Sequence, residues 1–327
     1  MKKITLAAFT FFSIAATAQQ KDYAYYKTIH VGDELGWDYV AADEENGNMY
    51  FSHAAKTLVV SINKDSVIAE IPKTLGVHGI AIANELSKGF ISNGKANSVT
   101  VFNLKNFSVL DTVAVTGANP DAILYDGFSK KVFTFNGKTN NTTVIDAVTL
   151  KVVATIALPG KPEFAVTDLK GKIYVNMEDK SELVQIDAAT LAVLKTWPIA
   201  PGDEPSGLAI DRTNNILFSV CSNKELIVFD IKKEKVTDSV AIGSRVDAVV
   251  FDPQSKLIYS SNGEGNVTII KQLNAHSYKV VQTLTTQKGS KTMMLDTKTK
   301  KIYLPAAKSE GDTRKILPGS FEILVYK

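Results

Sequence analysis

Seven aromatic residues recur along this chain at intervals of 40 to 44 residues, in segments that alternate apolar and polar side chains. A repeat of this length, carried by short alternating strands and turn residues, is typical of a β-propeller with one four-stranded blade per repeat. We therefore expect an all-β, seven-bladed propeller of antiparallel blades, in which the aromatic column packs between blades. Its members are Tyr50, Phe90, Phe133, Tyr174, Phe218, Tyr259 and Tyr303.

The ends of the chain predict how the ring closes. Six repeats contain four strand-like segments, whereas the seventh has two over 293–305 and one over 320–326, after an insertion over 307–318. The missing strand is expected at 25–31, where an apolar alternating segment ends at Gly32. Pairing of this N-terminal strand with the last blade would close the ring and remove exposed sheet edges.

The N-terminus indicates export. Lys2 and Lys3 precede a short apolar run that ends in Ala16-Thr17-Ala18, which is the pattern of a cleaved signal peptide over 1–18. The remaining residues, 19–327, are expected to form one propeller domain without a membrane span, periplasmic or secreted, and monomeric. The single cysteine, Cys221, excludes an internal disulfide and is expected in a partly exposed loop.

Net charge argues against nucleic-acid binding. The full sequence carries +3, and loss of Lys2 and Lys3 with the signal leaves about +1. Nucleic-acid-binding proteins usually carry a strongly basic face. Nothing in the overall charge predicts one.

The repeats resemble those of the YncE-like propeller family, built from the YVTN repeat. The resemblance covers the whole mature chain and rests on strand and turn positions, including Val144-Ile145-Asp146, Val228-Phe229-Asp230 and Gly117-Ala118-Asn119-Pro120. It implies an exported, surface-layer-like seven-bladed propeller with WD40-like repeats. DNA binding is also implied by the family, but no catalytic set of residues is.

Residues that follow the repeated glycines are the candidates for a ligand site. They should gather around the channel on the face formed by the loops between blades, where propellers usually bind. Carboxylates outnumber cations there, which favours a cation or cationic ligand; alternatively, these side chains only cap turns or face solvent. The candidate set is Glu34, Trp37, His78, Asn119, Asp121, Glu163, Glu204, Arg245, Asp247 and Lys291.

The leading functional hypothesis is a binding protein that holds a small molecule, glycan or protein at this face. The alternative is a lactonase-like hydrolase or a lyase that uses Ca²⁺ or Mg²⁺ held by the carboxylates, with His78 as a base. The usual catalytic and metal-binding motifs are absent from the sequence. No catalytic residue is therefore assigned, and we favour binding over catalysis.

Overall fold

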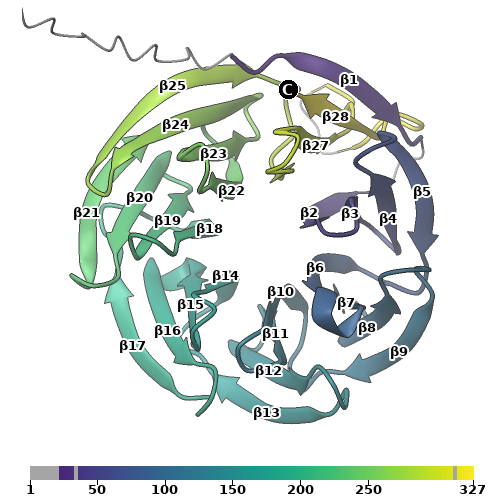
Figure 1. Ribbon diagram of the computed structural model, residues 1–327, viewed down its shortest axis with the longest axis vertical. Coiled ribbons are helices and arrows are strands. Elements are labelled where there is room, and N and C mark those ends of the chain that lie inside the picture. Colours follow the sequence, from purple (N-terminus) through teal and green to yellow (C-terminus); the bar gives the residue numbers. More distant parts are fainter. Residues whose placement is uncertain (1–21, 33–35, 312–314) are drawn as a thin grey trace, which may run out of the picture.

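The computed structural model describes residues 22–32, 36–311 and 315–327. The predicted signal peptide and Glu34 lie outside these ranges. The described strands form seven separate four-stranded antiparallel sheets, arranged radially around a central axis (Figure 1). The predicted seven-bladed propeller is therefore confirmed.

Each blade runs from an inner strand at the axis to an outer strand at the circumference. The inner strands are β2 (Trp37–Asp43), β6 (Val77–Ala83), β10 (Pro120–Asp126), β14 (Pro162–Thr167), β18 (Pro205–Asp211), β22 (Val246–Asp252) and β26 (Met294–Leu295). The second strands are β3 (Asn48–His53), β7 (Lys88–Asn93), β11 (Lys131–Asn136), β15 (Lys172–Met177), β19 (Ile216–Cys221), β23 (Leu257–Asn262) and β27 (Ile302–Ala306).

The third strands are β4 (Lys56–Ser61), β8 (Ser98–Asn103), β12 (Asn141–Asp146), β16 (Glu182–Asp187), β20 (Glu225–Asp230), β24 (Asn266–Asn274) and β28 (Glu322–Tyr326). The outer strands are β5 (Ser66–Ile71), β9 (Val109–Ala114), β13 (Val152–Ala157), β17 (Val193–Pro198), β21 (Lys235–Ala241), β25 (Ser277–Thr285) and β1 (Tyr25–His30). Two short 3₁₀ turns, η1 (Asn84–Leu86) and η2 (Glu178–Lys180), are the helical elements of the described chain, so none there is long and apolar enough to span a membrane.

The aromatic column forms the packing between blades, as predicted. All seven rings lie on second strands and are at most 2% exposed. Tyr50 of the first blade, for example, packs against Phe102 of the second, with ring centroids 5.3 Å apart. Each buried ring removes a large apolar area from water, so the column stabilises the packing of neighbouring blades.

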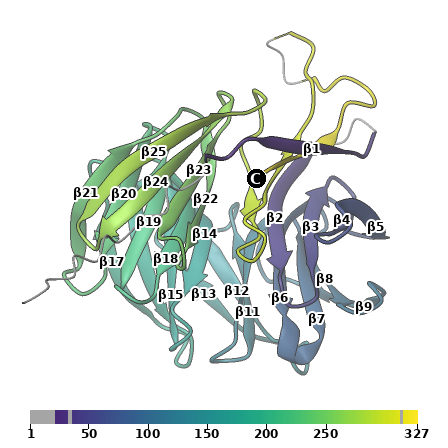
Figure 2. The same cartoon turned by 45° about the horizontal axis from the view of Figure 1, so that its top comes forward.

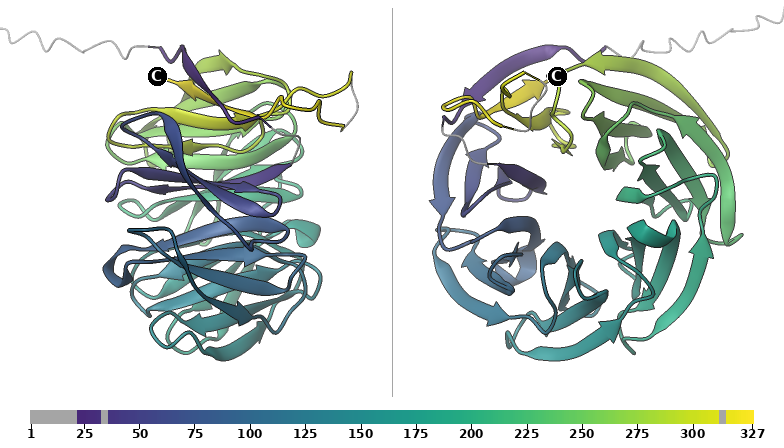
Figure 3. Two further views of the ribbon diagram at one scale, coloured as in Figure 1. Left: turned by 90° about the vertical axis from the view of Figure 1, so that its right-hand side faces the viewer. Right: turned by 180° about the vertical axis from the view of Figure 1, so that it is seen from behind.

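The ring closes through the N-terminal strand, again as predicted. Strand β1 pairs with β28, with Tyr25 opposite Tyr326 and His30 opposite Glu322. The closing blade is joined to the first blade by a buried ion pair, in which Lys301 Nζ contacts both carboxylate oxygens of Asp65 at 2.7 and 2.8 Å. The closed ring is visible from the front in Figure 1 and from behind in the right-hand view of Figure 3.

We call the face that carries the loops between consecutive blades the loop face. The loops between second and third strands open on the same face, because strand direction alternates within a blade. The described part of the insertion before β28 projects from it (Figure 2). The inner strands start at this face, so the first residues of each inner strand border the channel mouth.

Candidate functional site

One equivalent position of every repeat lies around the channel near the loop face. In the first six blades it is the second residue of the inner strand, and in the seventh it is the corresponding residue, three positions before β26. Six of the seven side chains at this position are ionisable. We call this set the polar ring: Asp38, His78, Asp121, Glu163, Ser206, Asp247 and Lys291.

A β-bulge lies at the ring position in six blades. The register between inner and second strand shifts there, for example between Trp37 and Val40 and between Pro120 and Ile123. The same shift occurs in the second, fourth, fifth and sixth blades. A bulge leaves one residue outside the regular pairing and redirects its side chain. At the bulge, the side chains of the polar ring therefore depart from the alternation between the two faces of the sheet that the rest of the strand follows.

Buried side chains of the second strands hold the backbone around the bulges. Ser52 Oγ accepts a hydrogen bond from the Asp38 N–H at 2.8 Å. Ser92 Oγ accepts one from the Gly79 N–H at 2.8 Å and donates to the Asp121 carbonyl of the next blade at 2.5 Å. The ring positions are therefore fixed by hydrogen bonds to the backbone, a preorganisation that favours a binding site over a flexible rim.

His78 lies between two carboxylates of the ring. Its Nδ1 is 2.6 Å from Asp38 Oδ2 and 3.6 Å from Asp121 Oδ1. Burial alone would lower the pKa of His78, but the hydrogen bond to Asp38 and the charge of Asp121 outweigh burial and raise it. Burial raises the pKa of Asp121 to about 6, although the neighbouring His78 opposes that rise. Asp121 therefore keeps part of its protons at a pH where a free aspartate is fully ionised.

Glu163 occupies the next ring position and is paired with a lysine. Lys161 Nζ lies 2.8 Å from Glu163 Oε1 and also contacts Glu178. Burial, followed by the charge of Asp121, nevertheless raises the pKa of Glu163 to about 8. The single lysine shared by two carboxylates does not offset the loss of water around Glu163.

The opposite side of the ring carries a second ion pair. Lys291 Nζ lies 2.5 Å from Asp247 Oδ2. Burial raises the pKa of Asp247 despite this contact. Carboxylates remain in excess over cations among the described ring residues and their immediate partners.

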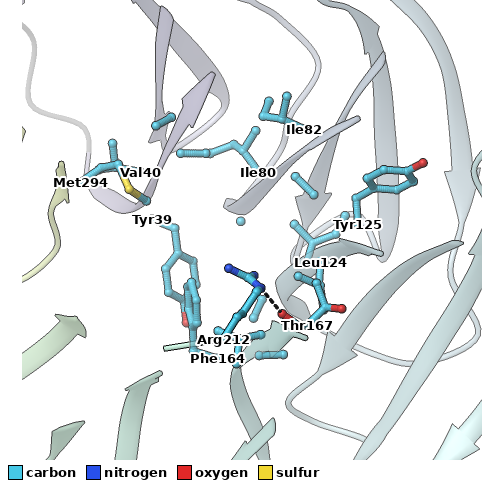
Figure 4. Close-up of a pocket in the computed structure, with 18 residues that line it drawn as sticks. Tyr39, Val40, Ile80, Ile82, Leu124, Tyr125, Phe164, Thr167, Arg212 and Met294 are labelled. Atoms are coloured by element: carbon cyan, nitrogen blue, oxygen red, sulfur yellow. Dashed lines mark hydrogen bonds between the residues drawn. The ribbon is translucent and has the colours of Figure 1, made fainter. Parts of the chain in front are cut away.

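Below the ring the channel becomes apolar. A cavity of about 430 Å³ is lined by the inner strands of the first four blades, together with Met294 and Arg212. Tyr39 and Phe164, each one residue past a ring position, face one another with ring centroids 5.4 Å apart (Figure 4). Burial and then the ring carboxylates raise the pKa of Tyr39 well above its usual range, so its hydroxyl stays protonated.

Several predicted site residues lie outside the ring, in the turns that precede the inner strands. Asn119, Glu204 and Arg245 each have a positive φ, between 46° and 58°. Trp37, Arg245 and Lys291 line a separate cavity of about 580 Å³ on the loop face. Only His78, Asp121, Glu163, Asp247 and Lys291 of the predicted set belong to the ring.

Two ring members and one ring partner were not predicted. Asp38 was passed over in favour of its neighbour Trp37, and Ser206 in favour of Glu204. Strict alignment of the repeats on His78 and Asp121 would have found both, because the spacing is preserved. Lys161 stands two residues before a ring position, where sequence alone gives no sign of its pairing with Glu163 and Glu178.

The prediction for Cys221 was wrong. It is the last residue of β19, is fully buried, and lies among apolar side chains. Burial raises the pKa of its thiol to about 12. The thiolate form is therefore negligible near neutral pH, and Cys221 is a core residue.

Three ring residues have the geometry of a metal-ligand set. One ligand atom from each of Asp38, His78 and Asp121 lies within 4.8 Å of the other two. A carboxylate–imidazole–carboxylate set suits zinc and related ions better than Ca²⁺ or Mg²⁺, which prefer oxygen ligands alone. The nitrogen that faces the carboxylates is Nδ1.

The fold and its central channel define a β-propeller of the kind also found in WD40-repeat structures. The solved structure described as "Crystal structure of RRP9 WD40 repeats" superposes with a TM-score of 0.78 at 7% identity, over 92% of this chain and 97% of that chain. "Structure of U3-55K" gives a TM-score of 0.77 at 7% identity, over 91% and 97%. These likenesses establish the fold alone.

A family model matches residues 7–203, which is more than half of the chain. The chain therefore belongs to the family described as "Domain of unknown function (DUF5074)". No curated protein has a matching sequence.

Proposed function

We propose that this chain is a binding protein that holds the cationic group of a small ligand at the polar ring. The observation that carries the proposal is the gathering of four partly buried carboxylates at the same position of four inner strands, those of Asp38, Asp121, Glu163 and Asp247. Burial raises the pKa of the last three. A carboxylate with a raised pKa is destabilised as an anion, and a bound cation would relieve that cost. A cation bound there therefore competes with the protons that these carboxylates hold near neutral pH.

Charge supports a cation over a phosphate or a nucleic acid. The ring holds four carboxylates, and Glu178 adds a fifth beside Lys161. Lys161 and Lys291 are already paired with carboxylates. Phosphate groups would meet net negative potential, so the DNA-binding role implied by the YncE-like resemblance gains no support from the ring.

The test compares ethylammonium binding by the wild type and by matched double variants. Asp38→Asn with Asp121→Asn removes two ring carboxylates while preserving side-chain size. Asp203→Asn with Glu204→Gln removes two carboxylates from the neighbouring turn, where they contact Ser181 and Ser222. We expect calorimetry to detect binding that is lost in the ring variant and retained in the turn variant. Equal affinities in both variants would refute the assignment.

A second candidate is a metal-assisted hydrolase or lyase, favoured by the close approach of Asp38, His78 and Asp121. Here a zinc-like ion would be held by these three residues and would polarise a substrate carbonyl or activate water. Metal titration followed by thermal unfolding separates the candidates. A rise in Tm with Zn²⁺ that disappears in His78→Ala supports the metal site, whereas no rise in the wild type rejects it.

Export to the periplasm or outside the cell is proposed on the N-terminal pattern of residues 1–18 alone. Secretion of a fusion to a reporter enzyme, with and without these residues, tests it. Retention of both fusions inside the cell would contradict export.

A further inference from the structure

The apolar part of the channel contains one cationic side chain that the proposed cation site does not use. Arg212 immediately follows β18 and reaches into the cavity below the ring (Figure 4). Its Nε donates a hydrogen bond to the Thr167 carbonyl at 2.9 Å. This bond anchors the guanidinium, and its Nη atoms make no hydrogen bond or ion pair with the described residues.

Among the described residues, the nearby carboxylates do not accept hydrogen bonds from the Nη atoms of Arg212. Asp168 is the carboxylate whose charge acts on it, but Asp168 Oδ1 accepts hydrogen bonds from the backbone N–H groups of Lys170 and Lys172. Glu85, near the same cavity, accepts a hydrogen bond from the Tyr125 hydroxyl at 2.6 Å. A guanidinium presents several donors in a planar fork, and here the outer donors of that fork remain available.

The rest of the cavity suits an apolar, flat body. Its volume of about 430 Å³ falls in the range of small-molecule sites. The tilted pair of Tyr39 and Phe164 lies at the end nearest the polar ring, and aliphatic side chains such as Ile80, Ile123 and Leu124 line the wall. An aromatic ring would gain burial against these side chains and favourable ring contacts.

The two ends of the channel differ in charge, and this difference sets the orientation of an anionic ligand. Thr167 ends β14 at the face opposite the loop face, whereas Glu163 begins it at the ring. The carboxylates of the ring repel an anion at one end, and Arg212 attracts it at the other. Arg212 is also the one cation at its position in the repeat; the equivalents in the other blades are Glu44, Asn84, Gly127, Leu169, Pro253 and Thr297.

We infer that the channel below the ring is a second ligand site, which binds a small aromatic carboxylate with its carboxylate on Arg212 and its ring beneath Tyr39 and Phe164. The carboxylate accepts two parallel hydrogen bonds from the guanidinium. This site does not depend on cation binding at the polar ring.

Benzoate and its neutral analogue benzamide are the probes, measured by calorimetry on the full chain. We expect benzoate to bind about tenfold or more tightly than benzamide, and Arg212→Gln to reduce benzoate affinity by about the same factor, since a charged hydrogen-bonded pair is lost. Arg212→Lys, which keeps the charge but not the fork, should fall between.

Two controls show whether a loss of benzoate binding comes from Arg212 itself. Denaturant unfolding of Arg212→Gln should match the wild type, because the exposed guanidinium makes a single hydrogen bond. The ring variant Asp38→Asn with Asp121→Asn should retain benzoate binding, which separates this site from the cation site. No benzoate binding up to its solubility limit, equal affinity for benzamide, or unchanged affinity in Arg212→Gln would each overturn the inference.

Discussion

His78 Nδ1 lies 2.6 Å from Asp38 Oδ2, and this contact joins the inner strands of the first two blades at the channel mouth. Asp121 of the third blade approaches the same nitrogen at 3.6 Å. The imidazole therefore neutralises part of the carboxylate charge when it is protonated. When it loses its proton, the ring becomes more negative.

Replacement of Asp38 by Asn should lower the pKa of His78. The hydrogen bond to the Asp38 carboxylate raises that pKa above its ordinary value, and the amide removes the charge that does so. A raised histidine pKa stabilises the fold at low pH, and this stabilisation is lost as pH rises through the raised value. An NMR titration of the His78 Cε1 proton measures the change. An unchanged midpoint in Asp38→Asn would show that Asp38 does not set it.

Stability should fall as pH rises wherever the ring carboxylates hold protons that the unfolded chain has released. For Glu163 this window runs from its ordinary value of 4.5 to about 8. Within it, one such site makes unfolding easier by at most about 1.4 kcal/mol per pH unit. Glu163→Gln should flatten the dependence in urea unfolding across this range. A wild type whose stability rises between pH 5 and 8 would contradict the raised pKa values.

Gly94 should control the position of His78. A Cβ on Gly94 would lie 2.6 Å from both Nε2 and Cδ2 of the imidazole, too close for any real contact. At the equivalent Gly137 a Cβ would lie 3.7 Å from its nearest neighbour, which is ordinary contact. We expect Gly94→Ala to displace the imidazole, which neutralises part of the ring's charge when protonated, and so to strengthen ethylammonium binding by up to about tenfold, or about 1.4 kcal/mol, while Gly137→Ala leaves binding unchanged. Similar affinities in the two variants would argue against a role for His78.

The buried pair of Lys301 and Asp65 should be essential to ring closure. Lys301→Met leaves the buried Asp65 carboxylate with one side-chain hydrogen bond from the described residues, which the Tyr303 hydroxyl donates at 3.0 Å. Removal of one partner of a buried ion pair costs about 3–5 kcal/mol. Denaturant unfolding should show this loss, and adding Asp65→Asn should recover part of it. A cost below about 1 kcal/mol, the size of a surface ion pair, would show that this ion pair does not hold the ring closed.

The sequence predicted the fold well because the fold depends on periodic features. The aromatic column, the short seventh repeat and the strand near Tyr25 each follow from spacing and alternation. The site was predicted only in part, since its side chains lie at β-bulges. A bulge changes which residue faces the channel. The ring positions belong to Asp38, one residue after the expected Trp37, and to Ser206, two residues after the expected Glu204. Ion pairs between residues far apart in the chain, such as Lys161 with Glu178 within the fourth blade and His78 with Asp121 between blades, depend on backbone geometry that no local pattern encodes.

The central claim is that a cation replaces protons held by the ring, and calorimetric counting of released protons tests it most directly. Ethylammonium is titrated near pH 7 in two buffers of different ionisation enthalpy. Because the pKa of Glu163 is raised to about 8, we expect binding to release close to one proton in the wild type and clearly less in Glu163→Gln. Binding without proton release, or no binding at all, would contradict the account.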